Sequence, residues 1–357
     1  MATDRALAGD GPQTSRAAWT ALASLVFTLA YAIWLILRLG GDEALRILSD
    51  VLFQVPSLAA TAACAVAAAR TRGRERAGWA AIAIGIGLWS TAEWVWSCYD
   101  LFLRVEPPLF SAADPLYYLG YPFILAGIAL LVVPAPGSRL DVKSLIDALL
   151  VITVLSIVAW NWLLLPLYEA TRASTTEVLV TFGYPVLDFA LVMALVFTFY
   201  RVQGNLTVPA TLLIAGMLTT TVADGIYLYT ATVSGYDVYG NPLELIWIAS
   251  YFAFAVAAVA RLDEGDGRAS EAARPLLNRR LHRIVGLALP YVVALPLIAF
   301  KMYEVSIGIL DLPLSAGIVL VLALAFVRQL LTLAEGRYLA RHGRRAGGER
   351  HLLPEQS

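Results

Sequence analysis

Runs of about 20 consecutive apolar residues recur along the whole chain, and no other feature of the sequence restricts the fold as strongly. A helix rises about 1.5 Å per residue, so each run is long enough to cross about 30 Å of hydrocarbon. Hydrophobic residues make up 59% of the 357-residue chain and charged residues 15%, a balance with too little charge for a soluble surface. We therefore predict an all-α, polytopic integral membrane helical bundle of about ten transmembrane helices arranged as repeated helical hairpins.

These apolar runs also divide the chain into segments. We expect a cytoplasmic N-terminal leader at 1–16, an eight-helix membrane core at 17–261 and a cytoplasmic linker at 262–283. A last transmembrane hairpin at 284–333 and a disordered cytoplasmic tail at 334–357 complete the chain, because the tail is rich in Arg, Gly and Glu. The predicted spans are 17–37, 47–69, 78–103, 116–134, 145–167, 178–200, 209–231, 243–261, 284–304 and 311–333.

The positions of arginine and lysine predict the orientation. An even number of helices places both termini on one side, and the loops of that side carry 21 of the 26 Lys and Arg residues. Short loops rich in these residues stay in the cytoplasm. We therefore expect a multi-pass protein of the cell membrane (inner or plasma membrane) with both termini in the cytoplasm.

The cysteines and histidines bear on metals and cofactors. Cys64 and Cys98 fall within predicted helices, where a small apolar side chain serves packing. The three histidines, at 282, 342 and 351, all lie in predicted cytoplasmic segments, which argues against a haem or a His-ligated metal in the bilayer. We predict no metal site and no cofactor. No folded basic module is recognisable, so we expect membrane lipids and no nucleic acid as partners.

A weak internal repeat of about 64 residues relates pairs of helices. Similar sequences surround Pro56, Pro122 and Pro185, and the sequence around Glu93 is similar to that around Asp224. Two of these prolines follow a tyrosine, and we expect both Tyr-Pro pairs in the first turns of their helices, where a missing N–H costs little.

Ionisable side chains inside membrane spans are costly, which makes them functional candidates. Glu93 and Asp224 occupy equivalent repeat positions in the outer half of the predicted bundle, and Asp188 lies one turn beyond the second Tyr-Pro pair. Hydroxyl groups, amides and many aromatic side chains occupy the same outer level. Three interpretations stay open for Glu93 and Asp224: interhelical hydrogen bonding that fixes packing, the lining of a ligand pocket, and proton transfer by a carboxyl group that is protonated in an apolar site.

The candidate residues divide by role. Glu93 and Asp224 are catalytic only if the protein is an enzyme. The predicted ligand-binding residues are Asp188, Tyr184, Trp96, Tyr121, Trp160, Asn161, Tyr227 and Thr220.

Several motifs support a family resemblance. They are the stretch 107–127 (PPLFSAADPLYYLGYPFILAG), the predicted helix 145–160 with Asp147, Tyr184-Pro185-x-x-Asp188, and Val222-Ala223-Asp224-x-x-Tyr227. Over about residues 80–335 the chain resembles the N-terminal multi-helix membrane sensory region of bacterial diguanylate cyclases, phosphodiesterases and histidine kinases. In that family an output domain follows the last helix, and we expect none here.

Three function classes follow. The resemblance and the outer aromatic residues favour a receptor-like or sensory protein that binds a lipophilic small molecule, apolar or amphipathic, in an outer-leaflet aromatic-acidic pocket and acts through a cytoplasmic signalling partner. A membrane-embedded enzyme of the terpene cyclase type is the alternative, because a protonated carboxyl can protonate an alkene or epoxide and aromatic faces stabilise a carbocation. The third is a transporter.

Overall fold

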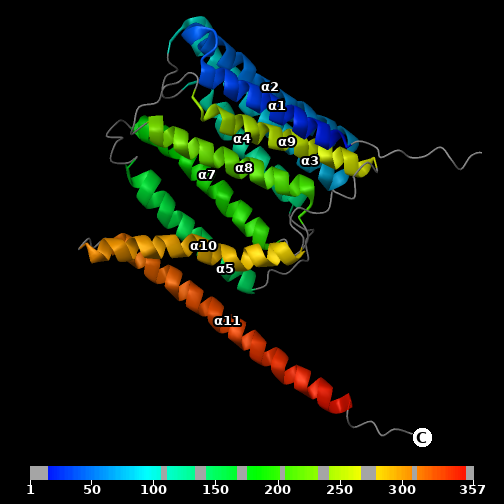
Figure 1. Cartoon of the computed structure of the whole chain (residues 1–357), viewed down its shortest axis with the longest axis vertical. Coiled ribbons are helices and arrows are strands. Elements are labelled where there is room, and N and C mark those ends of the chain that lie inside the picture. Colours follow the sequence, from blue (N-terminus) through cyan, green and yellow to red (C-terminus); the bar gives the residue numbers. More distant parts are fainter. Residues whose placement is uncertain are drawn as a thin grey trace, which may run out of the picture. The chain divides into compact units, whose positions relative to one another are not determined.

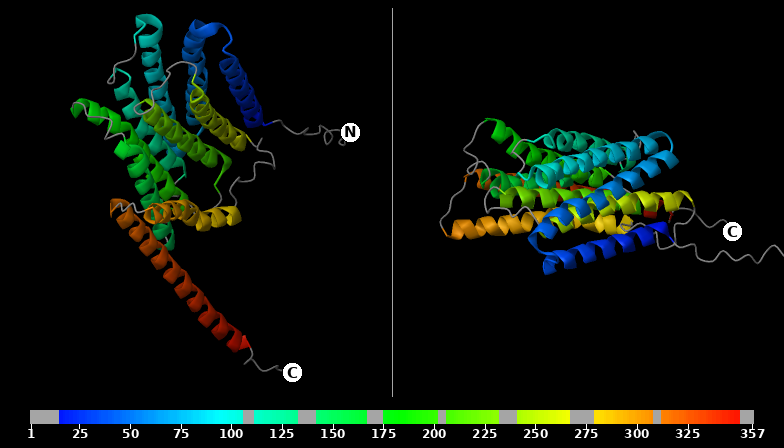
Figure 2. Two further views of the ribbon diagram at one scale, coloured as in Figure 1. Left: turned by 60° about the vertical axis from the view of Figure 1, so that its left-hand side comes forward. Right: turned by 90° about the horizontal axis from the view of Figure 1, so that it is seen from above.

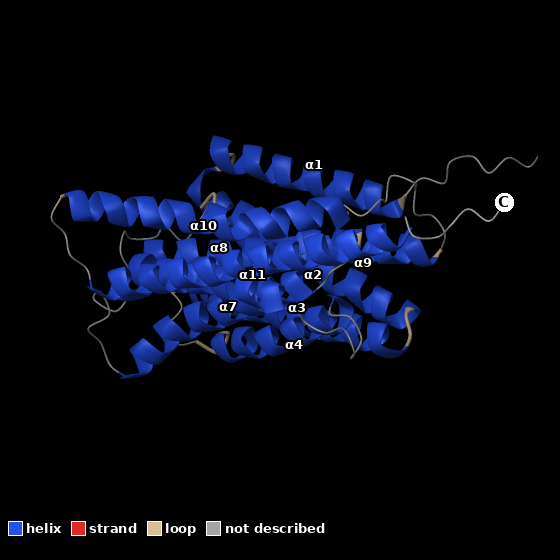
Figure 3. Cartoon of the chain, turned by 90° about the horizontal axis from the view of Figure 1, so that it is seen from below, coloured by secondary structure: helices blue, strands red, loops and turns tan. Residues whose placement is uncertain are grey.

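The computed structural model describes residues 15–105, 111–132, 142–166, 175–201, 206–231, 241–266, 279–307 and 312–350. Figure 3 shows that nearly all of these residues are helical. The α-helices and π-helical turns (η) are α1 (Arg16–Leu37), α2 (Gly41–Arg70), α3 (Gly73–Cys98), η1 (Tyr99–Leu103), α4 (Asp114–Val132), α5 (Val142–Ala159), η2 (Trp160–Leu164), α7 (Thr175–Arg201), α8 (Val208–Tyr229), α9 (Glu244–Gly265), α10 (Arg279–Ser306) and α11 (Leu312–Arg350).

The predicted fold class is confirmed. Each predicted span coincides with a described helix, and nine helices in the described ranges are long and apolar enough to cross a membrane. The remaining long helix, α3, has 26 residues and begins with the charged sequence Gly-Arg-Glu-Arg.

Two compact units make up the chain. The first comprises residues 1–136 and 162–282, and the second comprises residues 137–161 and 283–357. This division differs from the expected eight-helix core, because α5 belongs with α10 and α11 and not with the helices that flank it in sequence. Helix α5 contacts α11 through an apolar core and a buried ion pair, both described below.

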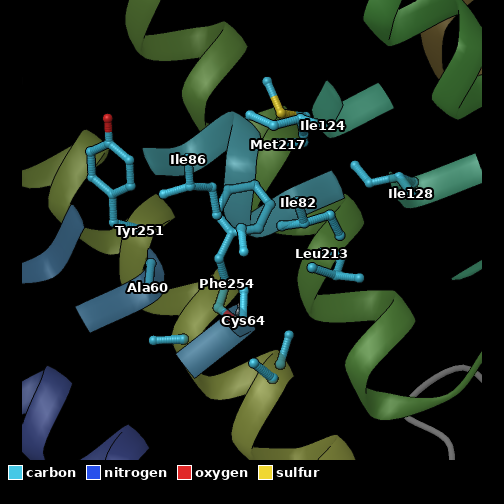
Figure 4. Close-up of a cluster of buried hydrophobic side chains, with 14 of the residues drawn as sticks. Ala60, Cys64, Ile82, Ile86, Ile124, Ile128, Leu213, Met217, Tyr251 and Phe254 are labelled. Atoms are coloured by element: carbon cyan, nitrogen blue, oxygen red, sulfur yellow. Dashed lines mark hydrogen bonds between the residues drawn. The ribbon is translucent and has the colours of Figure 1, made fainter. Parts of the chain in front are cut away.

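In the first unit, α2 packs against α3 and α9, and α9 also contacts α1 and α8. Figure 1 shows α1, α2 and α9 side by side. Helix α4 packs against α3 and also contacts α7 and α8. Apolar side chains from these helices form the core, and in Figure 4 the ring of Phe254 lies among Ile82, Ile86 and Leu213.

Helices α3 and α4 approach each other closely at glycine residues. Gly78 on α3 faces Gly127 on α4, and Gly85 on α3 faces Gly120 on α4. On each helix the two glycines lie seven positions apart. A Cβ atom on Gly85 would lie 2.9 Å from the carbonyl oxygen of Gly120. Small residues of this kind allow close backbone packing of membrane helices, where van der Waals contact replaces the hydrophobic effect between helices.

The second unit is built from α5, α10 and α11, and the last two are the orange and red helices of Figure 2. Helix α5 packs against α11 through an apolar core. Arg328 of α11 is 4% exposed, and its Nε donates to Asp147 Oδ1 of α5 at 2.7 Å. The Nη1 of Arg328 donates to the Tyr291 hydroxyl of α10 at 2.9 Å. A buried ion pair with additional hydrogen bonds ties α11 to α5 and α10.

Other details of the sequence prediction need correction. Pro122 and Pro185 lie well inside α4 and α7 and not in their first turns. Membrane helices tolerate interior proline because neighbouring helices and side chains satisfy the freed backbone groups. Helix α11 continues to Arg350, where a disordered tail was expected after residue 333. Of the other predicted cytoplasmic segments, residues 1–14, 267–278 and 351–357 lie outside the described residues.

Candidate functional site

A hydrogen-bonded group of one tyrosine, two aspartates and one tryptophan joins four helices of the first unit. The Tyr121 hydroxyl on α4 donates to Asp188 Oδ1 on α7 at 2.8 Å and lies 3.4 Å from Asp224 Oδ2 on α8. The indole N–H of Trp247 on α9 donates to Asp224 Oδ1 at 2.7 Å. Two carboxyl groups far apart in sequence therefore meet at one phenol.

At the Tyr121 hydroxyl, two carboxyl groups compete for one O–H donor. A phenol has one O–H, so Tyr121 can donate to one carboxylate at a time. The shorter contact marks Asp188 as its acceptor, and Asp224 receives its short hydrogen bond from Trp247. The second aspartate can approach the Tyr121 oxygen favourably only when a proton or another positive group lies between them.

Aromatic packing fixes the position of Tyr121. Its ring meets the edge of Trp89, with ring centroids 5.2 Å apart. The Trp89 indole N–H donates to the Tyr117 carbonyl oxygen at 3.0 Å. The Tyr227 ring packs edge-on against Trp247 at 5.9 Å. These ring contacts restrict the rotamers of Tyr121 and Trp247, so the two side chains that donate to the carboxyl groups are pre-positioned.

Glu93 belongs to the same region. Its carboxyl group interacts with the Tyr117 hydroxyl and lies in the electrostatic field of Asp224 and Glu244. The structure therefore joins Asp188 and Asp224 at Tyr121 and places Glu93 in the electrostatic field of Asp224, and all three are membrane carboxyl groups selected from the sequence. We call these three residues with Tyr121 and Trp247 the acidic–aromatic cluster.

Two further acidic residues begin helices beside this cluster. Asp114 Oδ2 accepts from the backbone N–H of Ser111 at 2.6 Å, and Glu244 Oε1 accepts from the backbone N–H of Asn241 at 3.3 Å. Both follow the capping-box spacing, in which the acidic residue three positions on reaches back to the first backbone donor. Their second oxygens accept from tyrosines: Tyr184 donates to Asp114 Oδ1 at 2.5 Å, and Tyr31 donates to Glu244 Oε2. The sequence analysis missed both residues, although the spacings Ser-x-x-Asp and Asn-x-x-Glu carry the signal.

The other predicted site residues differ in their burial and in the unit to which they belong. Thr220 is buried on α8 and hydrogen-bonds to Ser250 of α9. Trp96 is half-buried on α3. Trp160 is 51% exposed, and the amide nitrogen of Asn161 donates to the Ile157 carbonyl oxygen of its own helix at 2.9 Å. The last two belong to the second unit, so the structure does not join them to the acidic–aromatic cluster.

Charge distinguishes the cluster from the acidic positions that form ion pairs. Within the described part of the chain, no Lys or Arg forms an ion pair with Glu93, Asp188 or Asp224. In the same ranges, no group of three His, Cys, Asp or Glu side chains could hold a metal ion. Ion pairs elsewhere in the described residues include Arg16–Asp263, Arg46–Asp100, Arg261–Glu75, Lys301–Glu304 and Arg328–Asp147.

Comparisons with protein-family models, with curated proteins and with solved structures gave no match.

Proposed function

We propose that this protein is a receptor-like or sensory membrane protein that binds an amphipathic ligand at the acidic–aromatic cluster. The observation that carries the proposal is the meeting of Asp188 and Asp224 at the Tyr121 hydroxyl with no basic side chain of the described residues paired to them. Buried carboxylates are stable when they are paired or protonated. A ligand with a positively charged end supplies the missing partner.

The surroundings of the cluster favour the same class of ligand. A cation over the face of a Trp or Tyr ring is attracted by about 0.5–2 kcal/mol, depending on its desolvation. Trp247 and Tyr227 lie beside Asp224, and Trp89 lies beside Tyr121. An ammonium group with an apolar tail would therefore find carboxylates, aromatic faces and lipid-facing helices together.

The orientation belongs to the proposal. The excess of Lys and Arg in one set of loops supports a cytoplasmic position of both termini in a cell-membrane protein. The acidic–aromatic cluster then lies in the outer half of the bundle, where a ligand arrives from the outer leaflet. By its resemblance to bacterial sensory regions, we propose that the protein acts through a cytoplasmic signalling partner.

An enzyme of the terpene cyclase type is the second candidate, and one observation favours it. Tyr121 connects two carboxyl groups, so a proton can pass between Asp188 and Asp224 through its hydroxyl. In such a reaction Glu93 or Asp224 would donate a proton to an isoprenoid alkene, a C–H bond would form, and loss of a proton from the resulting carbocation would restore the acid. Transport is the third function class, and the hydrogen bonds of the acidic–aromatic cluster do not favour it.

The first experiment compares three probes that share a twelve-carbon tail: dodecylamine, dodecanol and laurate. Purified protein in lipid nanodiscs is titrated with each probe, and thermal unfolding is followed by tryptophan fluorescence. A ligand that binds the folded state raises the unfolding temperature with its concentration. We expect dodecylamine to stabilise the wild type more than dodecanol does, and laurate to have no stabilising effect.

Matched variants locate the effect. Asp188→Asn and Asp224→Asn should each abolish the difference in stabilisation between dodecylamine and dodecanol. Asp42→Asn is the control and should keep this difference, because Asp42 is an exposed residue in the first turn of α2. Equal stabilisation by laurate, or an amine effect that survives in both cluster variants, would refute the proposal.

A product search separates the two candidate functions. Organic extracts of cells expressing the wild type or Glu93→Gln, supplied with prenylated lipids, are compared by mass spectrometry. A new product made by the wild type alone identifies an enzyme and overturns the receptor proposal.

A further inference from the structure

Two helix pairs of the first unit repeat each other in sequence. Residues of α8 match residues of α3 that lie 131 positions earlier, so that Gly216 stands at the position of Gly85 and Asp224 at the position of Glu93. Residues of α9 match residues of α4 that lie 130 positions earlier. The matched pairs are Asp114 and Glu244, Tyr117 and Trp247, Gly120 and Ser250, and Tyr121 and Tyr251.

The packing of the two helix pairs repeats as well. A Cβ atom on Gly85 of α3 would lie 2.9 Å from the carbonyl oxygen of Gly120 on α4, and one on Gly216 of α8 would lie 3.2 Å from the carbonyl oxygen of Ser250 on α9. Both contacts join matched residues. Helices α4 and α9 also both begin with a capping box. Residues that match in sequence therefore occupy equivalent places in the two pairs.

This equivalence pairs Tyr251 with Glu93. The Tyr121 hydroxyl of α4 lies near the Asp224 carboxyl group of α8, which belongs to the other helix pair. The matched residues are Tyr251 of α9 and Glu93 of α3. We therefore expect the Tyr251 hydroxyl to lie on the side of the Glu93 carboxyl group.

The positions of both residues agree with this pairing. Arg261 near the end of α9 forms an ion pair with Glu75 at the start of α3, so these two helices run antiparallel. Tyr251 lies one turn before Phe254, whose ring packs among side chains of α3 (Figure 4). A helical side chain points toward the start of its own helix. For Tyr251 this direction leads toward the C-terminal end of α3, where Glu93 lies. In agreement, Tyr251 lies in the electrostatic field of Glu93.

The Tyr251 hydroxyl differs from the Tyr121 hydroxyl in its hydrogen bonding. Tyr121 donates to Asp188, whereas Tyr251 forms no hydrogen bond with any other residue that the structure describes. Tyr251 is 5% exposed, and Figure 4 shows its hydroxyl directed away from the apolar side chains around Phe254. A buried hydroxyl without a partner is unfavourable. A bound polar group that pairs with this hydroxyl and with the Glu93 carboxyl group removes that cost.

We propose that Glu93 and Tyr251 form a second half of the ligand site and bind a second ammonium group of the same ligand. This inference rests on the proposed function and narrows the ligand to a long-chain diamine, whose first ammonium group pairs with Asp188 and Asp224. An ammonium group has three N–H donors, so it can donate to the Glu93 carboxylate and to the Tyr251 oxygen together. Hydrogen bonds that involve an ionised group are roughly twice as strong as neutral ones, which favours an amine over an alcohol at this place.

The test compares dodecylamine with N-dodecyl-1,3-propanediamine, which has the same tail and two ammonium groups. Each probe is titrated into the full chain in nanodiscs of a zwitterionic lipid, and the rise in unfolding temperature is followed by tryptophan fluorescence. We expect the diamine to reach half of its full effect at a concentration about tenfold lower than dodecylamine does. Glu93→Gln and Tyr251→Phe should each reduce this ratio to about three or less. Tyr303→Phe, the same substitution at a residue that is 61% exposed on α10, should keep it.

A second measurement uses the proteins without ligand. Because the Tyr251 hydroxyl has no hydrogen-bond partner, Tyr251→Phe should unfold within about 2 °C of the wild type. Tyr121→Phe should unfold at a clearly lower temperature, because it loses the hydrogen bond to Asp188. Tyr251→Phe also covers the case in which Glu93→Gln fails to fold.

Equal half-saturating concentrations of the two amines in the wild type would overturn this inference. They would leave the proposed function standing if dodecylamine still stabilises the protein more than dodecanol does. A ratio that is unchanged in Tyr251→Phe or in Glu93→Gln would also overturn the inference, because the second ammonium group would then bind elsewhere. A Tyr251→Phe protein as unstable as Tyr121→Phe would overturn it too, since the Tyr251 hydroxyl would then be bonded within the protein.

Discussion

Replacing Gly120 by alanine tests the close packing of α3 and α4 and its connection to the acidic–aromatic cluster. A Cβ atom at this position would lie 2.2 Å from the indole nitrogen of Trp89 and 3.1 Å from the carbonyl oxygen of Gly85. The indole cannot stay in place at that distance. Its movement breaks the hydrogen bond to the Tyr117 carbonyl oxygen and the ring contact with Tyr121.

The magnitude follows from these contacts. Overpacking a well-packed core costs about 1–3 kcal/mol. The lost hydrogen bond adds about 1 kcal/mol, and the lost aromatic pair adds about 0.5–1.5 kcal/mol. Alanine is the better helix former by about 1 kcal/mol, which offsets part of the loss. We expect Gly120→Ala to lower the free energy of unfolding by about 2–4 kcal/mol.

Equilibrium unfolding in mixed micelles by SDS titration, followed by tryptophan fluorescence, measures this change. Gly225→Ala is the matched control, since it makes the same substitution inside α8 where no atom lies within 4 Å of the added Cβ. This control should gain about 0.5–1 kcal/mol. A Gly120→Ala protein as stable as the wild type, or a control that loses as much, would show that the close contact of α3 and α4 does not limit stability.

Two further predictions concern the second unit and the orientation. Arg328→Met should lower the free energy of unfolding by about 3–5 kcal/mol, because it leaves the buried Asp147 carboxylate without its cation. The double variant Asp147→Leu/Arg328→Met should recover most of this loss in the same SDS titration, and a single variant as stable as the wild type would contradict the role of the ion pair. The Asp42 side chain is exposed beside the turn between α1 and α2, on the proposed outer side. A membrane-impermeant maleimide added to intact cells should therefore label an Asp42→Cys variant that also carries Cys98→Ser, and should not label Cys98→Ser alone. Labelling confined to inverted membrane vesicles would reverse the proposed orientation.

Much of the candidate site was accessible from residue type alone. Carboxyl groups inside apolar runs are rare because burial is costly, so Glu93, Asp188 and Asp224 stood out without any structural information. Tyr121, Tyr227 and Thr220 were selected for their level in the predicted helices, and they do lie in the first unit with the three acids. Trp160 and Asn161 were selected for the same predicted level along their helix, but they lie in the other unit.

The amino-acid sequence by itself determined which segments are helices and that they span a membrane. An apolar run must satisfy its backbone hydrogen bonds internally in lipid, and only a helix does so within one segment. Tertiary structure decided which helices become neighbours. Lipid-facing and partner-facing surfaces are both apolar, so hydrophobic periodicity does not distinguish them. Helices α5 and α11 meet through an apolar core and through Asp147 and Arg328, which are 181 residues apart in sequence. The same holds for Tyr121, whose two carboxyl contacts lie 67 and 103 residues away and arise only from the packing of α4 against α7 and α8.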